Sequence, residues 1–258
     1  MTMISDHVVI DPSVKLGKNV TIYPFVYIEK NVTIGDDCVI YPYVSIMEGT
    51  TLGKGNKIYQ NAVLGAVPQD FNYTGDVTEL IIGDNNTIRE NVVINRATFA
   101  GHKTIIGDDN FLLEGVHVLH DTHIGNGCVF GYGSKIAGSC EIQDGVILSS
   151  NVVVNPKVRI GNSSMIQSGC RCSKDVPPYI VAAHNPIKYA GVNTTILNNL
   201  AVDAKVQKHI ANAYRLVFHD QTSIFDAVLQ IKEQIPKGPE IETIVKFVED
   251  SQLGIISR

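Results

Sequence analysis

The sequence has no tryptophan, and aromatic residues make up only 7% of its 258 residues. It contains no apolar run of about 18 residues, so we expect no membrane-spanning helix. Lysine and arginine (21) are outnumbered by aspartate and glutamate (26), which argues against a nucleic-acid-binding protein, because such proteins are usually basic. The first residues show no basic segment followed by an apolar one, so we expect no secretory signal.

Cysteine is scarce and shows no pairing pattern. There are five cysteines, and only Cys170 and Cys172 lie close together, at a spacing too short for a zinc knuckle. Neither an HExxH motif nor paired CxxC motifs occur, and no glycine-rich loop follows a strand and opens a helix. We therefore expect a reduced, cytoplasmic chain.

What the sequence does have is a large aliphatic residue at every sixth position. Of the 27 positions in this phase from Ile10 to Ile166, only Asp70, Asp76 and Ala100 are not large and apolar. A period of six matches neither a helix, with about 3.6 residues per turn, nor a simple alternating strand. It is typical of a hexapeptide solenoid, a parallel β-helix.

A second register of valine and cysteine lies two residues before the first, as at Val20 and Cys38. Residues two apart on a strand point to the same face, so each hexapeptide predicts one short strand and one corner. Gly17, Gly35 and Gly53 recur at a constant spacing of three hexapeptides. One turn of the coil should therefore have three flat sides.

Two segments interrupt the repeat, residues 66–80 and residues 96–103. Loops that leave a regular scaffold frequently carry function. We therefore expect these two loops to lie near a functional site.

The six-residue pattern stops after Tyr179, and apolar stripes at helical spacing follow from about residue 196. Ser223 is placed to cap a helix that runs to about Ile235. The stripes before and after this helix comprise Val206, Ile210, Ala213, Tyr214 and Val217, then Ile241, Ile244, Val245 and Val248. We predict a β-helix over residues 1–190 and an α-helical C-terminal domain over residues 191–258.

The densest cluster of chemically active side chains is Glu114-Gly-Val-His117-Val-Leu-His120-Asp121-Thr-His123. Strand phase places His117 and His123 outward on successive faces, and His120 at a corner beside Asp121. A histidine with an adjacent carboxylate is suited to general-base catalysis. A solvated surface cluster and a metal site shared between subunits, as in hexapeptide carbonic anhydrases, are the alternatives.

Together these residues resemble the acyl-[acyl-carrier-protein]–UDP-N-acetylglucosamine O-acyltransferases, which begin lipid A synthesis. The similarity covers essentially the whole chain. The matching segments are Gln69-Asp70, Ile82–Glu90, His117–Asp121, Ala137-Gly138, Asp175–Tyr179, Gly191–Asn193 and Ala211–Tyr214.

The resemblance implies a left-handed parallel β-helix and transfer of a 3-hydroxyacyl chain to the 3-hydroxyl of UDP-N-acetylglucosamine, without a metal or cofactor. His120 would be the general base, Asp121 would orient it, and the N–H of Gly138 would stabilise the oxyanion. The implied sugar-nucleotide contacts are Gln69, Asp70, His117, Ser139, Asn155 and Asn193. Ser168 would contact the acyl chain. The family resembles a parallel homotrimer with its active sites between neighbouring subunits.

The chain departs from the family pattern where cations are usual. Asn72 stands at a basic position, and the segment after Asn193 lacks arginine. Arg171, Lys174 or Lys157 could supply the missing contacts to the diphosphate. Docking of the acidic carrier protein would also need a basic patch. The candidates for that patch are Arg159, Arg171, Lys174, Arg215 and Lys246.

Two alternative activities remain open at this point. The altered nucleotide cleft is compatible with N-acylation of an amino-sugar nucleotide. The histidine cluster is compatible with a zinc-dependent carbonic anhydrase on the same solenoid.

Overall fold

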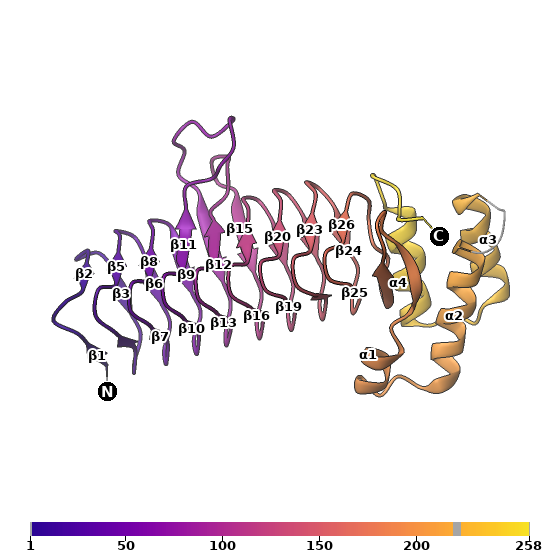
Figure 1. Cartoon of the computed structure of the whole chain (residues 1–258), viewed down its shortest axis with the longest axis horizontal. Helices are drawn as coiled ribbons and strands as arrows, with labels where there is room; N and C mark the ends of the chain where they lie inside the picture. The colour runs from indigo at the N-terminus through magenta and orange to yellow at the C-terminus, as the bar shows by residue number, and fades with distance from the viewer. Residues whose placement is uncertain (1, 219–222, 258) are drawn as a thin grey trace.

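A computed structural model describes residues 2–218 and 223–257. Within these residues the chain winds as a long three-sided coil of short strands, with four helices packed at its C-terminal end (Figure 1). The strands form three sheets, one along each side of the coil, which we name A, B and C.

Sheet A contains β1 (Met3–Ile4), β4 (Thr21–Ile22), β7 (Val39–Ile40), β10 (Lys57–Ile58), β13 (Thr87–Ile88), β16 (Phe111–Leu112), β19 (Val129–Phe130), β22 (Ile147–Leu148), β25 (Met165–Ile166), β27 (Ile180–Ala183) and β28 (Lys188–Val192). Sheet B contains β2 (Val9–Ile10), β5 (Tyr27–Ile28), β8 (Ser45–Ile46), β11 (Val63–Ala66), β14 (Val93–Asn95), β17 (His117–Val118), β20 (Lys135–Ile136), β23 (Val153–Val154) and β26 (Arg171–Cys172). Sheet C contains β3 (Lys15–Leu16), β6 (Thr33–Ile34), β9 (Thr50–Leu52), β12 (Glu79–Ile82), β15 (Lys103–Ile106), β18 (His123–Ile124), β21 (Glu141–Ile142) and β24 (Arg159–Ile160).

Neighbouring strands within each sheet come from successive turns of the coil. Thr21 pairs with Val39, and His117 pairs with Lys135, both in parallel and both at a spacing of three hexapeptides. This register confirms the three-sided turn predicted from the glycine spacing. The exception is β28, which pairs antiparallel with β27 where the coil ends.

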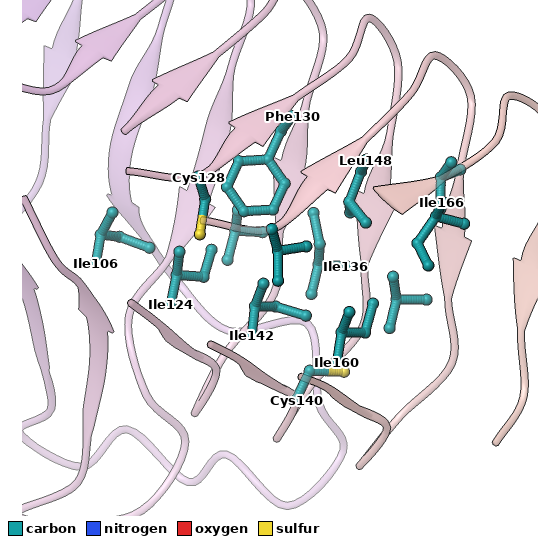
Figure 2. Packing of buried hydrophobic residues seen from close by; sticks show 14 of the residues in the cluster. Ile106, Ile124, Cys128, Phe130, Ile136, Cys140, Ile142, Leu148, Ile160 and Ile166 are labelled. Atoms are coloured by element: carbon teal, nitrogen blue, oxygen red, sulfur yellow. The ribbon is translucent and has the colours of Figure 1, made fainter. Parts of the chain in front are cut away.

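The aliphatic residues of both registers fill the interior of the coil. Ile136, Ile142 and Leu148 are at most 1% exposed, one from each sheet of a single turn. Figure 2 shows these side chains stacked with those of the turns above and below. Burial of one such side chain stabilises a fold by about 1.5–3 kcal/mol, so the repeated rows supply the main driving force for the coil.

A ladder of buried asparagines replaces the apolar residue at one inner corner. Asn56 Oδ1 accepts a hydrogen bond from the N–H of Asn86, and Asn86 Oδ1 accepts one from Asn110 (both 2.9 Å). Asn110 Oδ1 then accepts from the N–H of Cys128 (2.8 Å). Each asparagine amide also donates to a glycine carbonyl, so these buried polar groups are satisfied.

Both predicted loops leave the coil at the same corner, between sheets B and C, which we name the B–C edge. Residues 67–78 connect β11 to β12, and residues 96–102 connect β14 to β15, as the protrusion in Figure 1 shows. Arg96 ties the two loops together, because its Nη2 donates to the hydroxyl of Tyr73 (3.0 Å) and its Nη1 donates to the carbonyl of Gly65 (3.3 Å).

The helical segment contains α1 (Thr194–Asn199), α2 (Ala204–Phe218), α3 (Ile224–Gln234) and α4 (Pro239–Glu249). Ser223 caps α3 as predicted, since its hydroxyl accepts a hydrogen bond from the N–H of Asp226 (3.1 Å). None of the helices within the described residues is long and apolar enough to cross a membrane. The boundary predicted at residues 190 and 191 lies inside β28, and the division into two domains stays a prediction.

Candidate active site

The B–C edge places His120 and Gly138 one above the other on successive turns. The N–H of Ser139 donates to the carbonyl of His120 (3.0 Å), and the N–H of Lys157 donates to the carbonyl of Gly138 (3.1 Å). Equivalent corner residues are therefore in direct register. The repeat of three hexapeptides per turn aligns residues along the edge, and the two loops rise beside them.

His120 is held on one side by a carboxylate and a hydroxyl. Its Nδ1 lies 2.8 Å from Oδ2 of Asp121 and 2.9 Å from Oγ1 of Thr98. A carboxylate only accepts hydrogen bonds, and Asp121 lies closer to Nδ1 (2.8 Å) than Asp70 lies to Nε2 (3.4 Å), so the proton of the neutral ring belongs on Nδ1 and the lone pair on Nε2. This is the tautomer that a base acting through Nε2 requires.

Asp121 is itself fixed by the loop over residues 96–102. The N–H of Thr98 lies 3.2 Å from both carboxylate oxygens, and the N–H of Asp121 donates to the hydroxyl of Thr104 (2.9 Å). Burial alone would raise the pKa of Asp121, but hydrogen bonds from His120 and Thr98 outweigh it and lower the pKa below its usual value. The carboxylate therefore stays ionised at neutral pH. Exposed His102 approaches its other oxygen, Oδ1, at 3.5 Å.

Gly138 lies against the face of the His120 ring. A Cβ at this position would lie 2.4 Å from His120 Cε1 and 2.7 Å from Nε2, so no side chain fits without displacing the imidazole. The N–H of Gly138 donates a hydrogen bond to no atom of the described residues. A free backbone donor thus lies beside the nitrogen that carries the lone pair.

Asp70 reaches the site from the first loop. Its Oδ2 lies 3.4 Å from Nε2 of His120, while its Oδ1 accepts hydrogen bonds from the backbone and the side chain of Asn72 (2.7 and 2.8 Å). Asn72 thus orients the neighbouring carboxylate. Gln69 is exposed next to Asp70 on the same loop.

His117 lies on sheet B and His123 on sheet C, which confirms that the two point outward on successive faces. Nε2 of His117 lies 2.9 Å from Oδ1 of buried Asn95, whose amide donates to the carbonyl of Val67 (2.7 Å). Nε2 therefore carries the proton of the neutral ring, and Nδ1 is free to accept a hydrogen bond. Burial, and then the charge of Lys135, lower the pKa of His117, which keeps the ring neutral at pH 7.

The remaining predicted residues lie in three places. Ser139 and Asn155 lie at corners of the B–C edge, next to the residues described above. Ser168 lies instead at the corner between sheets A and B. Asn193 is 4% exposed, caps α1, and donates to the carbonyl of Ser163 (3.0 Å). Within one chain, neither Ser168 nor Asn193 belongs to the B–C edge.

Two residues of this network, Thr98 and Asn95, were missed in the sequence, and Asn72 was noted there only as a departure from the family pattern. Thr98 and Asn95 are fully buried and contact His120 and His117 directly, and Asn72 orients Asp70. Their positions in or beside the two interrupting loops were the available signal. Across the described residues, no group of three or more His, Cys, Asp or Glu is arranged to hold a metal ion.

This arrangement is suited to acyl transfer. Nε2 can take a proton from a hydroxyl, Asp121 can stabilise the resulting imidazolium, and the N–H of Gly138 can donate to an oxyanion that forms beside the ring. Asp70 and Nδ1 of His117 can accept hydrogen bonds from further hydroxyl or amide groups of an acceptor.

Comparison with family models identifies two matches. Residues 175–256 match the model described as UDP-N-acetylglucosamine O-acyltransferase, domain 2, and residues 22–129 match the model of the GMPPB C-terminal domain.

Curated relatives cover the whole chain. The acyl-[acyl-carrier-protein]–UDP-N-acetylglucosamine O-acyltransferase of Halorhodospira halophila is 33% identical over 99% of this chain and 100% of its own length. The corresponding protein of Ectopseudomonas mendocina is 35% identical over 99% of both chains.

Solved structures agree with this result. The UDP-N-acetylglucosamine acyltransferase of Bacteroides fragilis is 46% identical, covers 98% of this chain and 100% of its own, and superposes with a TM-score of 0.97. The enzyme of Francisella novicida is 33% identical and covers 99% of this chain and 94% of its own, with a TM-score of 0.96. These superpositions confirm a left-handed β-helix with a C-terminal helical part.

Proposed function

The chain belongs to the acyl-[acyl-carrier-protein]–UDP-N-acetylglucosamine O-acyltransferase family, and from this premise we propose a division of labour among its own residues. It is an acyltransferase that moves an acyl chain from acyl carrier protein to UDP-N-acetylglucosamine, the first step of lipid A synthesis. His120 acts as the general base on the sugar 3-hydroxyl, Asp121 and Thr98 hold its ring, and Gly138 supplies the oxyanion donor. The contact that carries this proposal is the 2.8 Å bond between Nδ1 of His120 and Asp121.

The proposed reaction is balanced by one proton on His120. Nε2 takes the proton of the 3-hydroxyl as the oxygen attacks the thioester carbonyl, and the negative charge that develops on the carbonyl oxygen is met by the N–H of Gly138. The carbon–sulfur bond then breaks, and the leaving thiolate takes the proton that the imidazolium has held. Asp70, 3.4 Å from Nε2, stabilises the positive ring while it carries that proton.

We further propose that the site is completed in a parallel homotrimer. The catalytic group lies at the B–C edge, whereas Ser168 and Asn193 lie on other edges of the coil, so a neighbouring subunit is needed to bring them to one substrate. Phe71, in the first loop, is fully exposed, and this apolar side chain is suited to packing against the next copy. The five cysteines are free and buried, which supports a reducing cytoplasm as the compartment.

The assignment of the base is tested by His120→Ala. Loss of the base should lower kcat by about 10²–10⁴-fold, measured by mass spectrometry of the 3-O-acylated product, while the oligomer stays intact in size-exclusion chromatography. The matched control is His123→Ala, which removes an exposed histidine from the adjacent face and should leave kcat unchanged. Retained activity in His120→Ala would show that another group takes the proton.

A further inference from the structure

A cationic cavity opens at the C-terminal end of the B–C edge. It has a volume of about 250 Å³, and its polar lining includes Arg171, Ser173, Lys174, Asn185 and Ser257. Among the described residues, no carboxylate belongs to this lining. A concave surface with two cations and several neutral hydrogen-bonding groups is suited to an anion.

Among the residues that the structure describes, no acidic group neutralises either cation. Nη1 of Arg171 donates to the neutral side chain of Asn155 (3.1 Å), and neither Arg171 nor Lys174 forms an ion pair with any described residue. Arg159 lies on β24 of sheet C. Its Nε lies 3.1 Å from Oε2 of Glu141, and its guanidinium group lies over the ring of Phe247. Arg159 is therefore occupied, whereas Arg171 and Lys174 keep free donors.

The coil aligns both cations with the catalytic residues. Along sheet B, His117 pairs with Lys135, Lys135 with Val153, and Val153 with Arg171. Along the B–C edge, Lys174 lies two turns of the coil beyond Gly138 and three turns beyond His120. Because adjacent strands are about 4.8 Å apart, the backbone at Lys174 lies roughly 10 Å from Gly138 and roughly 14 Å from His120.

We propose that Arg171 and Lys174 form a phosphate subsite for the acyl donor. It holds the phosphodiester that joins the donor's pantetheine arm to the carrier protein, while the thioester lies against Gly138. This inference rests on the proposed function and adds a binding site to it. Thirteen bonds separate the sulfur of that arm from its phosphorus, roughly 16 Å when extended, or about four to five residues of extended chain. Two turns of coil plus the reach of a lysine or arginine side chain match that length.

The length also separates this phosphate from those of the sugar nucleotide. The β-phosphorus lies five bonds from the 3-hydroxyl oxygen, roughly 6 Å. Starting from His120, that distance covers about one turn of the coil rather than three. The cavity is therefore assigned to the donor and not to the diphosphate of the acceptor.

The experiment compares S-acyl-phosphopantetheine with S-acyl-pantetheine, which lacks only the phosphate. Binding of both to the intact protein is measured by calorimetry, and turnover with UDP-N-acetylglucosamine is measured separately. The wild type should bind the phosphorylated compound at least about tenfold more tightly, because hydrogen bonds to charged groups contribute about 1.5–3 kcal/mol. Arg171→Gln with Lys174→Gln should abolish that preference and leave KM for UDP-N-acetylglucosamine unchanged.

The matched control is Lys57→Gln, a cation exposed on an outward strand position of sheet A, and it should keep the full preference. Equal binding of both compounds by the wild type would overturn the subsite, as would a preference that survives in the double variant. A rise in KM for UDP-N-acetylglucosamine with the donor preference intact would also overturn it, by assigning the cations to the nucleotide. Absence of turnover would contradict the proposed function, and the binding comparison would still decide the subsite.

Discussion

The regular turns of the coil and the turns that carry the loops differ only at one edge. From β15 to β26, equivalent strands follow each other every three hexapeptides, whereas Val63 and Val93 are five hexapeptides apart and Glu79 and Lys103 are four apart. The paired strands nevertheless stay in parallel register through the interruption. The repeat thus provides a regular lattice of backbone positions. The loops add the side chains that complete the candidate active site at the B–C edge.

The largest effect on activity is expected from a substitution at Gly138, which lies at the catalytic corner of a regular turn. Gly138→Ala places a methyl group 2.4 Å from His120 Cε1 and must displace the ring. The rate should fall by about 10²–10⁴-fold, the contribution of a positioned base, with little change in melting temperature. Steady-state kinetics and thermal unfolding measure the two quantities.

Gly238→Ala is the control for this substitution. Gly238 has extended backbone at φ −178°, and a Cβ there would meet only the end of the Glu240 side chain at 3.7 Å. Its activity should match the wild type. An active Gly138→Ala enzyme would mean that the imidazole does not need its observed position.

A second prediction compares stability in the two regions. Leu148 on sheet A is fully buried, and Leu148→Ala should lower the free energy of unfolding by about 2–5 kcal/mol. Val77→Ala removes an 82% exposed side chain from the first loop and should change it by less than about 0.5 kcal/mol. Urea denaturation of both variants measures the difference. Comparable losses would show that the loop contributes to the core as much as the lattice does.

The lattice could be predicted from the sequence because every turn repeats the same physical requirement. A residue such as Ile136 must be apolar to fill the interior, and its equivalents recur at fixed spacing. The helices followed from apolar stripes and from the cap at Ser223. Asn56 and its partners did not fit the apolar rule, because their hydrogen bonds are made with residues up to 30 positions away.

The site could be predicted only in part. His120 and Asp121 are adjacent in sequence, so their pairing was evident, and the spacing of three hexapeptides brings Gly138 to the same corner. Thr98 and Asn95 could not be paired with the histidines, because the interrupting loops break the repeat that relates sequence spacing to position. The contacts of Ser168 and Asn193 with a substrate stay predictions, since each lies on a different edge of the coil.

The smallest effect is expected from the residue that the second loop contributes. Thr98→Val keeps the buried shape and the backbone N–H on Asp121 but removes the hydroxyl 2.9 Å from Nδ1 of His120. The value of kcat should fall about tenfold, since a hydrogen bond to a charged group is lost. KM for both substrates should stay unchanged, because Thr98 acts on the ring and not on the substrates.

Thr98→Ser restores the hydroxyl and should restore kcat. If Thr98→Ser loses activity while Thr98→Val keeps it, the methyl group matters and the role of Thr98 is packing. If neither loses activity, Asp121 alone is sufficient to orient His120.

The asparagine ladder has a consequence for how such a chain can change. Asn56, Asn86 and Asn110 are separated by 30 and then 24 residues, yet each binds the next as if no insertion were present. The asparagine ladder therefore keeps successive turns in register, whatever the length of the segment inserted between them. The length of a loop at the B–C edge can therefore change without disturbing the coil. Segments of other lengths could be grafted there to recognise other acceptors while the catalytic corner remains in place.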